Sequence, residues 1–374
     1  MADKDRTTRR RVLKGTAAAG IAGLAGCSGN GGSGSDGGDG SSDGSGGGTP
    51  TQSGSGGSGG DTETKGGSGS LSTKLAVAHY PVIPDTAPFI VGMEKGIYEK
   101  HGVTIQDVTS FSGGGTTVRG IVTGGIGMGG TALPALIQGY NAGAPIYVSG
   151  LEMNQSPINF HVLPDSDIES IQDCKGKTIA VSNPGSSSEA MTIASVKAAD
   201  GISLSDIEIM HAGGLGEAIT AMNEGSADVA WNIAPKSTAM LQKDQSRVVW
   251  WGRDYAPNVT EMVLAVGGKV KRENPEVAKR LLAAQVECFD FVKNNQKETA
   301  KLWAKAAEMP EDLMVAALKE AKPEKIFETV SPREEVLKST AATMIEQGLI
   351  DEQPAWNEIV WDDPLPEDLQ VDWP

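Results

Sequence analysis

From Leu71 to Val266 the sequence alternates short β-like runs with helical stretches, and this alternation constrains the fold more than any other feature. Strands that alternate with helices along a chain form mostly parallel sheets covered by helices. From Asn274-Pro275 onward the pattern is mainly helical, because asparagine is a good helix cap and proline suits a first turn. The fold class is therefore α/β. The expected strands are 75–79, 104–109, 126–129, 146–151, 159–163, 178–182, 207–211, 228–232, 247–251 and 262–266.

Residues 124–150 and 225–251 show the same order of elements at a constant offset of 101 positions. Each contains a glycine turn, a strand, a small polar residue, a proline-opened helix and another strand, with Pro134 aligned to Pro235. Such a correspondence predicts two related lobes. Two independently built α/β sheets would share this order too, and they would also give similar lobes.

The N-terminal part has the pattern of an export signal. Thr8-Arg9-Arg10-Arg11-Val12-Leu13-Lys14 precedes a short Ala/Gly-rich core that ends at Cys27. We expect 1–26 to be a removed twin-arginine lipoprotein signal and Cys27 to carry lipid. Residues 27–70 are rich in Gly, Ser, Asp and Thr, a composition typical of a disordered tether. This predicts a protein anchored on the extracytoplasmic face of the cell membrane; a basic tail with a chance cysteine is the alternative.

The charge balance limits the partners. The chain has 48 acidic and 32 basic residues, and the part after residue 70 keeps 41 acidic against 25 basic ones, for a net charge of −16. This argues against nucleic acid and against an anionic membrane surface. A cationic ligand and a general solubility device, for instance in high salt, both fit such acidity.

Cysteine usage and motifs give little sign of catalysis. After Cys27 only Cys174 and Cys288 remain, with no metal-ligand spacing, and a disulfide between them stays open. Cys288 lies on an apolar stripe of helical spacing within 277–292, which indicates core packing. The sequence has no nucleophile elbow, no HExxH and no phosphate loop. We therefore expect no enzymatic activity, no cofactor and no metal.

Candidate ligand contacts follow from the fold class. In open α/β sheets the ligand lies beyond the carboxyl ends of the strands, and two facing lobes would enclose it in a cleft. Small residues in these loops let backbone amides at helix N-termini approach a solute closely. The predicted ligand-binding residues are Tyr80, Gly113, Gly114, Thr131, Asn154, Ser187, Ser188, Trp231 and Asn232.

Several of these residues have a second interpretation. Ser186 and Glu189 fit a capping box, and Glu189 would bring a carboxylate close to the site. Thr131 and Asn232 are good helix caps, but their equivalent places in the two lobes favour ligand contact, so Asn232→Ala is expected to weaken stabilisation by a ligand. Trp231 could stack on a flat or methylated ligand. Arg119 and Arg253 are the cations best placed to pair with an acidic solute, or they are ordinary solvated charges.

The segment Pro88-Phe89-Ile90-Val91 with Glu94-Lys95-Gly96-Ile97-Tyr98-Glu99-Lys100-His101-Gly102-Val103 resembles a motif of solute-binding proteins of ABC importers, of the nitrate, sulfonate and taurine type. Residues 173–181 and 224–230 add to this resemblance, which spans nearly all of 72–360 and overlaps the family related to thiamine-pyrimidine precursor synthases. It implies a two-lobed type II periplasmic-binding-protein fold, with lobe one at 71–165 and 268–374, completed by the C-terminal helices, and lobe two at 166–267.

The resemblance implies a monomeric receptor that delivers a small molecule such as a sulfonate, nitrate or taurine to a membrane permease with its ATPase. A thiamine-precursor pyrimidine or another heteroaromatic solute is the alternative, because few cations are well placed. A pyrimidine-precursor synthase is disfavoured, since the cysteine cluster of those enzymes is absent from this sequence. An extracellular sensor domain is a third hypothesis.

Overall fold

The computed structural model describes residues 71–111, 114–124 and 126–373. The predicted signal at 1–26, the segment 27–70 with Cys27, and the candidate Gly113 lie outside these described residues.

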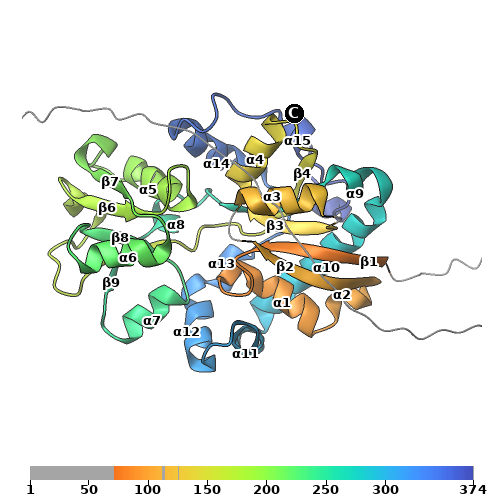
Figure 1. Ribbon diagram of the computed structural model, residues 1–374, viewed down its shortest axis with the longest axis horizontal. Coiled ribbons are helices and arrows are strands. Elements are labelled where there is room, and N and C mark those ends of the chain that lie inside the picture. Colours follow the sequence, from red (N-terminus) through yellow and green to blue (C-terminus); the bar gives the residue numbers. More distant parts are fainter. Residues whose placement is uncertain (1–70, 112–113, 125, 374) are drawn as a thin grey trace, which may run out of the picture. The chain divides into compact units, whose positions relative to one another are not determined.

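Lobe one is built on a five-stranded sheet with the order β2-β1-β3-β10-β4. Figure 1 labels β1 to β4 of this sheet. β1, β2 and β3 are parallel, while β10 runs antiparallel to both of its neighbours. The elements of this lobe before the crossing are β1 Leu71–Ala78, η1 Pro84–Thr86, α1 Ala87–Glu94, α2 Ile97–Lys100, β2 Val103–Phe111, α3 Gly114–Thr123, β3 Met128–Ala132, α4 Leu133–Asn141 and β4 Ile146–Leu151. Those after the return are β10 Met262–Gly267, α9 Gly268–Glu273, α10 Pro275–Asn294, α11 Gln296–Ala307, α12 Glu311–Ala321, α13 Pro323–Ile326, α14 Glu334–Glu346, α15 Trp356–Ile359 and η4 Glu367–Leu369.

Lobe two repeats this plan with the strand order β7-β6-β8-β5-β9. β6 is parallel to β7 and β8, and β5 is antiparallel to β8 and β9. Its elements are β5 Asn159–Val162, η2 Ile171–Cys174, β6 Thr178–Val181, α5 Ser187–Ala198, η3 Leu204–Asp206, β7 Glu208–His211, α6 Leu215–Asn223, β8 Val229–Asn232, α7 Lys236–Gln242, β9 Arg247–Trp251 and α8 Gly252–Tyr255. The prediction of two mostly parallel sheets flanked by helices is confirmed.

The lobe boundaries predicted after residues 165 and 267 are wrong by one strand each. β5 was assigned to lobe one but pairs with β8 and β9 of lobe two, and β10 was assigned to lobe two but pairs with β3 and β4 of lobe one. The chain therefore crosses at 152–158, between β4 and β5, and at 256–261, between α8 and β10. Periodicity identifies a strand, but backbone pairing decides which sheet it joins, so the sequence pattern could not place these two strands.

The lobe-one sheet is buried on both faces. Alternate residues of β10 point to opposite sides, so that Leu264 and Val266 pack with α1, α10 and α12 while Val263 and Ala265 pack with α3, α4 and α14. Helices after β10 thus contribute to both layers, as predicted for C-terminal helices that complete this lobe (Figure 1). Such two-sided burial explains the almost continuous apolar run of β10.

Cys174 and Cys288 are both free and buried, so the disulfide left open by the sequence is absent between them. Cys288 packs in the lobe-one core as its helical stripe predicts, and Cys174 packs in the core of lobe two. Within the described ranges no helix combines the length and the apolar run needed to cross a membrane.

Candidate functional site

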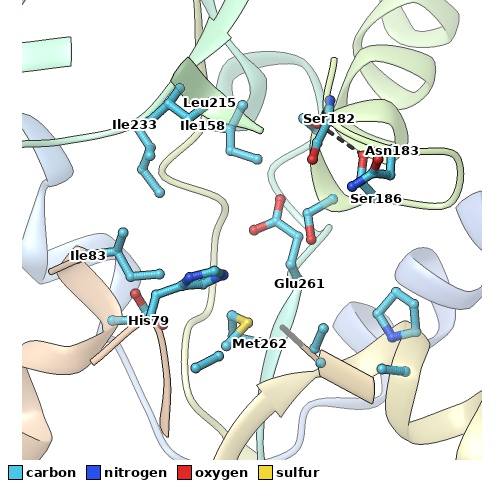
Figure 2. A pocket seen from close by; sticks show the side chains of 18 of the residues that line it. His79, Ile83, Ile158, Ser182, Asn183, Ser186, Leu215, Ile233, Glu261 and Met262 are labelled. Carbon is cyan, nitrogen blue, oxygen red and sulfur yellow. Dashed lines mark hydrogen bonds between the residues drawn. The ribbon is translucent and has the colours of Figure 1, made fainter. Parts of the chain in front are cut away.

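A cavity of about 990 Å³ is lined by loops from both sheets. In lobe one the lining comes from the loops after β1, β2 and β3 and from the start of β10, and in lobe two from the loops after β6, β7 and β8. These are the carboxyl ends of parallel strands, where α/β folds bind ligands. Figure 2 shows His79, Ile83 and Met262 on one side of the space and Ser182, Asn183 and Ser186 on another.

The wall from lobe two is built mainly of hydroxyl groups and glycines. Ser186 is the N-cap of α5, and its Oγ accepts a hydrogen bond from the Glu189 amide at 3.4 Å. The Ser182 amide donates to Ser188 Oγ at 2.9 Å, which fixes the loop after β6 against the helix start. Gly213 and Gly214 complete this wall after β7. It carries polar groups without formal charge.

Glu189 does not line this cavity, contrary to the prediction that it brings a carboxylate to the site. Its Oε2 accepts hydrogen bonds from the Gly185 amide at 2.6 Å and from Gln347 Nε2 at 3.1 Å. Its Oε1 lies 2.7 Å from His211 Nε2. These partners hold the side chain in the contact between α5 and α14, away from the lining.

The wall from lobe one is apolar with two buried carboxyl groups. Asp85 is fully buried in the short helix η1, and Glu261 is 5% exposed at the end of the second crossing. Both line the cavity. The two side-chain oxygens of Asp85 and the Oε1 atom of Glu261 are buried without a side-chain hydrogen-bond partner. The Glu261 side chain does form a hydrogen bond with Ser156. Figure 2 shows the Glu261 carboxyl group turned into the open space.

Burial controls the ionisation of these groups. Loss of hydration raises the pKa of Asp85 to about 7, although its own backbone amide opposes this change. Burial also raises the pKa of Glu261 to about 8, and the nearby charge of Asp85 acts in the same direction. A third carboxyl group, Glu152, does not line the cavity, and neither of its buried oxygens has a hydrogen-bond partner. Burial, followed by the charge of Asp85, raises its pKa well above the usual range. The three groups form a buried acidic cluster, and among the described residues no lysine or arginine lines the cavity beside them.

No lysine or arginine is among the described residues that line the cavity. Arg253, predicted to pair with an acidic solute, is buried elsewhere: its guanidinium stacks on Trp251 at 3.9 Å and donates to the carbonyls of Glu320 and Ala321. Arg119 is exposed on α3 and does not line the cavity either. Neither cation is placed to bind a solute in this cavity.

The structure brings five of the predicted ligand-binding residues to the lining, namely Tyr80, Gly114, Ser187, Ser188 and Trp231. Thr131, Asn154 and Asn232 are fully buried and do not line it. Thr131 Oγ1 donates to the Gly114 carbonyl at 3.3 Å, and thereby positions a loop that does.

Asn154 and Asn232 bind the protein's own backbone. Asn154 Oδ1 accepts from the Thr329 amide at 3.0 Å, and Asn232 Oδ1 accepts from the Ile233 amide at 2.9 Å. Nδ2 of Asn232 faces the Met240 sulfur at 3.4 Å. Helix capping does not explain Thr131 or Asn232, since the caps of α4 and α7 are Ala132 and Pro235.

Asp85 and Glu261 were missed by the sequence reasoning. Glu261 precedes strand β10, whereas the loops predicted to bind the ligand follow strands. Because β10 is antiparallel to β3, with Met262 opposite Ala132, the start of β10 lies at the same edge as the carboxyl end of β3. Asp85 does follow β1, in Pro84-Asp85-Thr86, and a carboxylate between apolar segments was the available signal.

A sequence model of the family described as NMT1/THI5 like matches residues 83–299. The chain belongs to this family. Among curated relatives, a binding protein of Brucella abortus (strain 2308) is 25% identical over 217 residues, which are 58% of this chain and 66% of that protein. The chain thus spans slightly less than two thirds of this relative's length.

Solved structures of similar architecture include two periplasmic binding proteins. The aliphatic sulphonate binding protein SsuA from Escherichia coli is 20% identical, covers 81% of this chain and 96% of its own, and has a TM-score of 0.66. The nitrate-binding protein NrtA from Synechocystis PCC 6803 is 16% identical, covers 80% and 87%, and has a TM-score of 0.62. The desulfurization enzyme DSZB is 14% identical, covers 79% and 97%, and has a TM-score of 0.56. These structural similarities confirm the predicted periplasmic-binding-protein fold. The enzyme DSZB has a similar fold, so the fold does not distinguish a binding protein from an enzyme.

Proposed function

We propose that this protein is the solute receptor of an ABC importer, which captures a small molecule in the cavity between its lobes and delivers it to a membrane permease. The observation that carries the proposal is the cavity itself, because loops at the carboxyl ends of both sheets line it. The similarity to a binding protein of Brucella abortus and to the solute-binding proteins SsuA and NrtA supports a binding role. Transport energy would come from a separate ATPase, as no phosphate loop occurs in the sequence.

Binding is expected to bring the lobes together around the solute. The test is a thermal-shift screen of the full chain with nitrate, taurine, aliphatic sulfonates, aminopyrimidines and organic amines, because a ligand of the native state raises the unfolding midpoint. Small-angle scattering of any complex should show a smaller radius of gyration than that of the unliganded protein. Absence of binding by every solute, and by a metabolite extract, would contradict the receptor function.

Enzymatic turnover is the competing outcome, and DSZB gives a reason to test it. The two described cysteines line no part of the cavity. Burial raises the pKa of the Cys174 thiol to about 12 and that of Cys288 further still, which disfavours a thiolate nucleophile. A bound solute recovered with unchanged mass after long incubation supports a receptor, whereas a converted product identifies an enzyme.

Anchoring by lipid on Cys27 remains part of the proposal. The twin-arginine pattern and the small residues before Cys27 support export and processing. Mass analysis of protein extracted from membranes should find a lipidated Cys27 at the N-terminus. A chain that begins at Met1 would contradict both the processing and the anchor.

A further inference from the structure

We propose that the solute is an organic cation, with its positive charge on nitrogen and an apolar body, rather than a sulfonate or nitrate. This inference rests on the proposed receptor function and names the class of ligand for that same cavity. It depends on what the lining offers a charged solute: buried carboxyl groups on one side, neutral hydroxyl groups on the other, and an apolar surface between them.

Glu261 provides the first contact. Its side chain is 95% buried, as only 5% is exposed, and it points into the cavity (Figure 2). Its Oε1 has no hydrogen-bond partner in the described protein. A buried hydrogen-bond acceptor without a partner costs free energy. We therefore assign a hydrogen-bond donor on the ligand as the partner of Glu261 Oε1.

Asp85 and Glu152 add two further buried carboxyl groups close to Glu261. All four of their carboxyl oxygens are buried without partners, and Asp85 lines the cavity. The charges of Asp85 and Glu261 repel each other, and so do those of Asp85 and Glu152. A cation placed beside them would stabilise their ionised forms, whereas those ionised forms would repel a sulfonate or nitrate.

The remainder of the lining does not offset this charge. It holds no lysine or arginine within the described ranges, and the residues outside them between 71 and 373 are Ser112, Gly113 and Gly125, which carry no charge. Serine hydroxyls and glycine amides from lobe two can accept or donate hydrogen bonds to a polar part of the solute. The cavity is therefore acidic overall when its carboxyl groups ionise.

The apolar lining indicates an organic cation instead of a metal ion. Ile83, Ile158, Ile233 and Leu215 contribute aliphatic surface, and Trp231 contributes an aromatic one. Aromatic rings also attract cations through their π-faces. No group of three or more His, Cys, Asp or Glu side chains in the described parts of the chain has the arrangement to hold a metal.

The test is a matched set of probes applied to the full chain at low salt. Benzamidine, benzamide and benzenesulfonate have similar size and carry a positive, a neutral and a negative group; choline, 4-aminopyridine, taurine and nitrate widen the set. Cations should raise the unfolding midpoint, and calorimetry should then give their affinities. An anion that binds in the cavity, or a set in which no cation binds, overturns the proposal. Binding of an anion in the cavity would overturn the organic-cation proposal but leave the receptor function intact. If no solute and no component of a metabolite extract binds, both the organic-cation proposal and the receptor function are contradicted.

Glu261→Gln tests the contact directly, with the exposed Glu224→Gln as its matched control. We expect the first change to weaken cation binding roughly tenfold to hundredfold, because a charge-assisted hydrogen bond is lost, and the control to leave it unchanged. Equal affinities in both variants would overturn the assignment of Glu261.

Wild-type calorimetry gives a readout that does not depend on folding of a variant. Asp85 interacts electrostatically with both Glu261 and Glu152. Ser156 hydrogen-bonds to Glu261, and His79 lines the same cavity. A bound cation lowers the pKa of the carboxyl groups, so protons should leave and cation affinity should rise from pH 6 to pH 8. Proton uptake, or an affinity that falls with pH, would contradict the proposal.

Discussion

The two walls of the cavity come from lobes of the same topology but differ in chemistry. Lobe one presents buried carboxyl groups, Asp85 and Glu261, in apolar surroundings. Lobe two presents the serine run at the start of α5, in which the Ser186 and Ser188 hydroxyl groups bond to each other and accept from the amides of Glu189 and Ser182. Charge is therefore concentrated on one wall, while the other offers neutral polar groups.

The difference separates two tasks that a solute receptor has to perform. Unpartnered buried carboxyl groups discriminate strongly by charge, because their ionisation depends on what lies beside them. Hydroxyl groups and backbone amides at a helix start are less selective, and they can close over many polar solutes. Each of the following changes alters one wall, or the contact between the lobes, and leaves the other features in place.

The largest effect is expected from removing the carboxyl groups of lobe one. Their pKa values in the folded protein, about 7 for Asp85 and about 8 for Glu261, lie above those of the unfolded chain. Their stabilising contribution is therefore complete below about pH 4 and falls above it by about 1.4 kcal/mol per pH unit for each proton, until it is fully lost once pH has passed 7 for Asp85 and 8 for Glu261. Asp85→Asn with Glu261→Gln should flatten this fall.

Chemical denaturation from pH 5 to pH 8 measures the slope of stability in wild type and in the double variant. The difference between the two proteins is the informative quantity, because His161, whose pKa burial lowers to about 4, changes stability in the opposite direction in both. Identical slopes would show that the carboxyl groups do not take up protons on folding.

A smaller effect is expected at the contact between α12 and lobe two. Glu320 accepts hydrogen bonds from Asn159 at 3.2 Å and from the hydroxyl groups of Ser237 and Thr238. Glu320→Gln should cost about 1–3 kcal/mol, since a charged acceptor of three donors is lost. The unfolding midpoint should fall by roughly 2–4 °C per kcal/mol. The exposed Glu352→Gln is the control, and an equal midpoint in both variants would contradict this role.

The role of the lobe-two wall is tested by a substitution that fills part of the cavity beside it. Ser187→Trp places a large side chain at the start of α5, and it should weaken benzamidine binding about tenfold through loss of space. The preference for benzamidine over benzenesulfonate should remain, because lobe one sets it. Ser226→Trp, at an exposed turn of the same lobe, is the control. Loss of the charge preference in Ser187→Trp would show that lobe two also determines it.

The smallest effect on binding is expected at Asn232. Its amide bonds to Ile233 and faces Met240, so Asn232→Ala should lower stability while the midpoint shift caused by benzamidine stays the same. The sequence pattern predicted a weaker shift. Thermal melts with and without benzamidine decide between the two expectations.

Much of the fold could be predicted from the pattern of residues. Each expected strand from 75–79 to 262–266 overlaps an observed one, and the proline-opened helices follow β3 and β8 as expected. The assignment of β5 and β10 failed for a physical reason: each is an antiparallel strand that enters the sheet of the other lobe. A local apolar run does not indicate which of the two sheets the strand will join.

Part of the cavity lining could be predicted from the sequence. Ser187, Ser188 and Gly114 were found because small residues after a strand follow a general rule, and that rule holds for parallel strands. Glu261 lies at the same edge only because β10 runs in the opposite direction. Thr131 and Asn232 occupy equivalent positions in the two lobes, yet both turn inward to the protein's own groups.

The sequence by itself determined the two α/β lobes, the family and the loops that approach the cavity, because these depend on periodicity and on residue types close together in the chain. Tertiary structure alone decided the charge of the cavity. Asp85, Glu152 and Glu261 are ordinary acidic residues in an acidic sequence. They become an unpaired cluster because folding removes them from water beside one another, with no described cation in the lining.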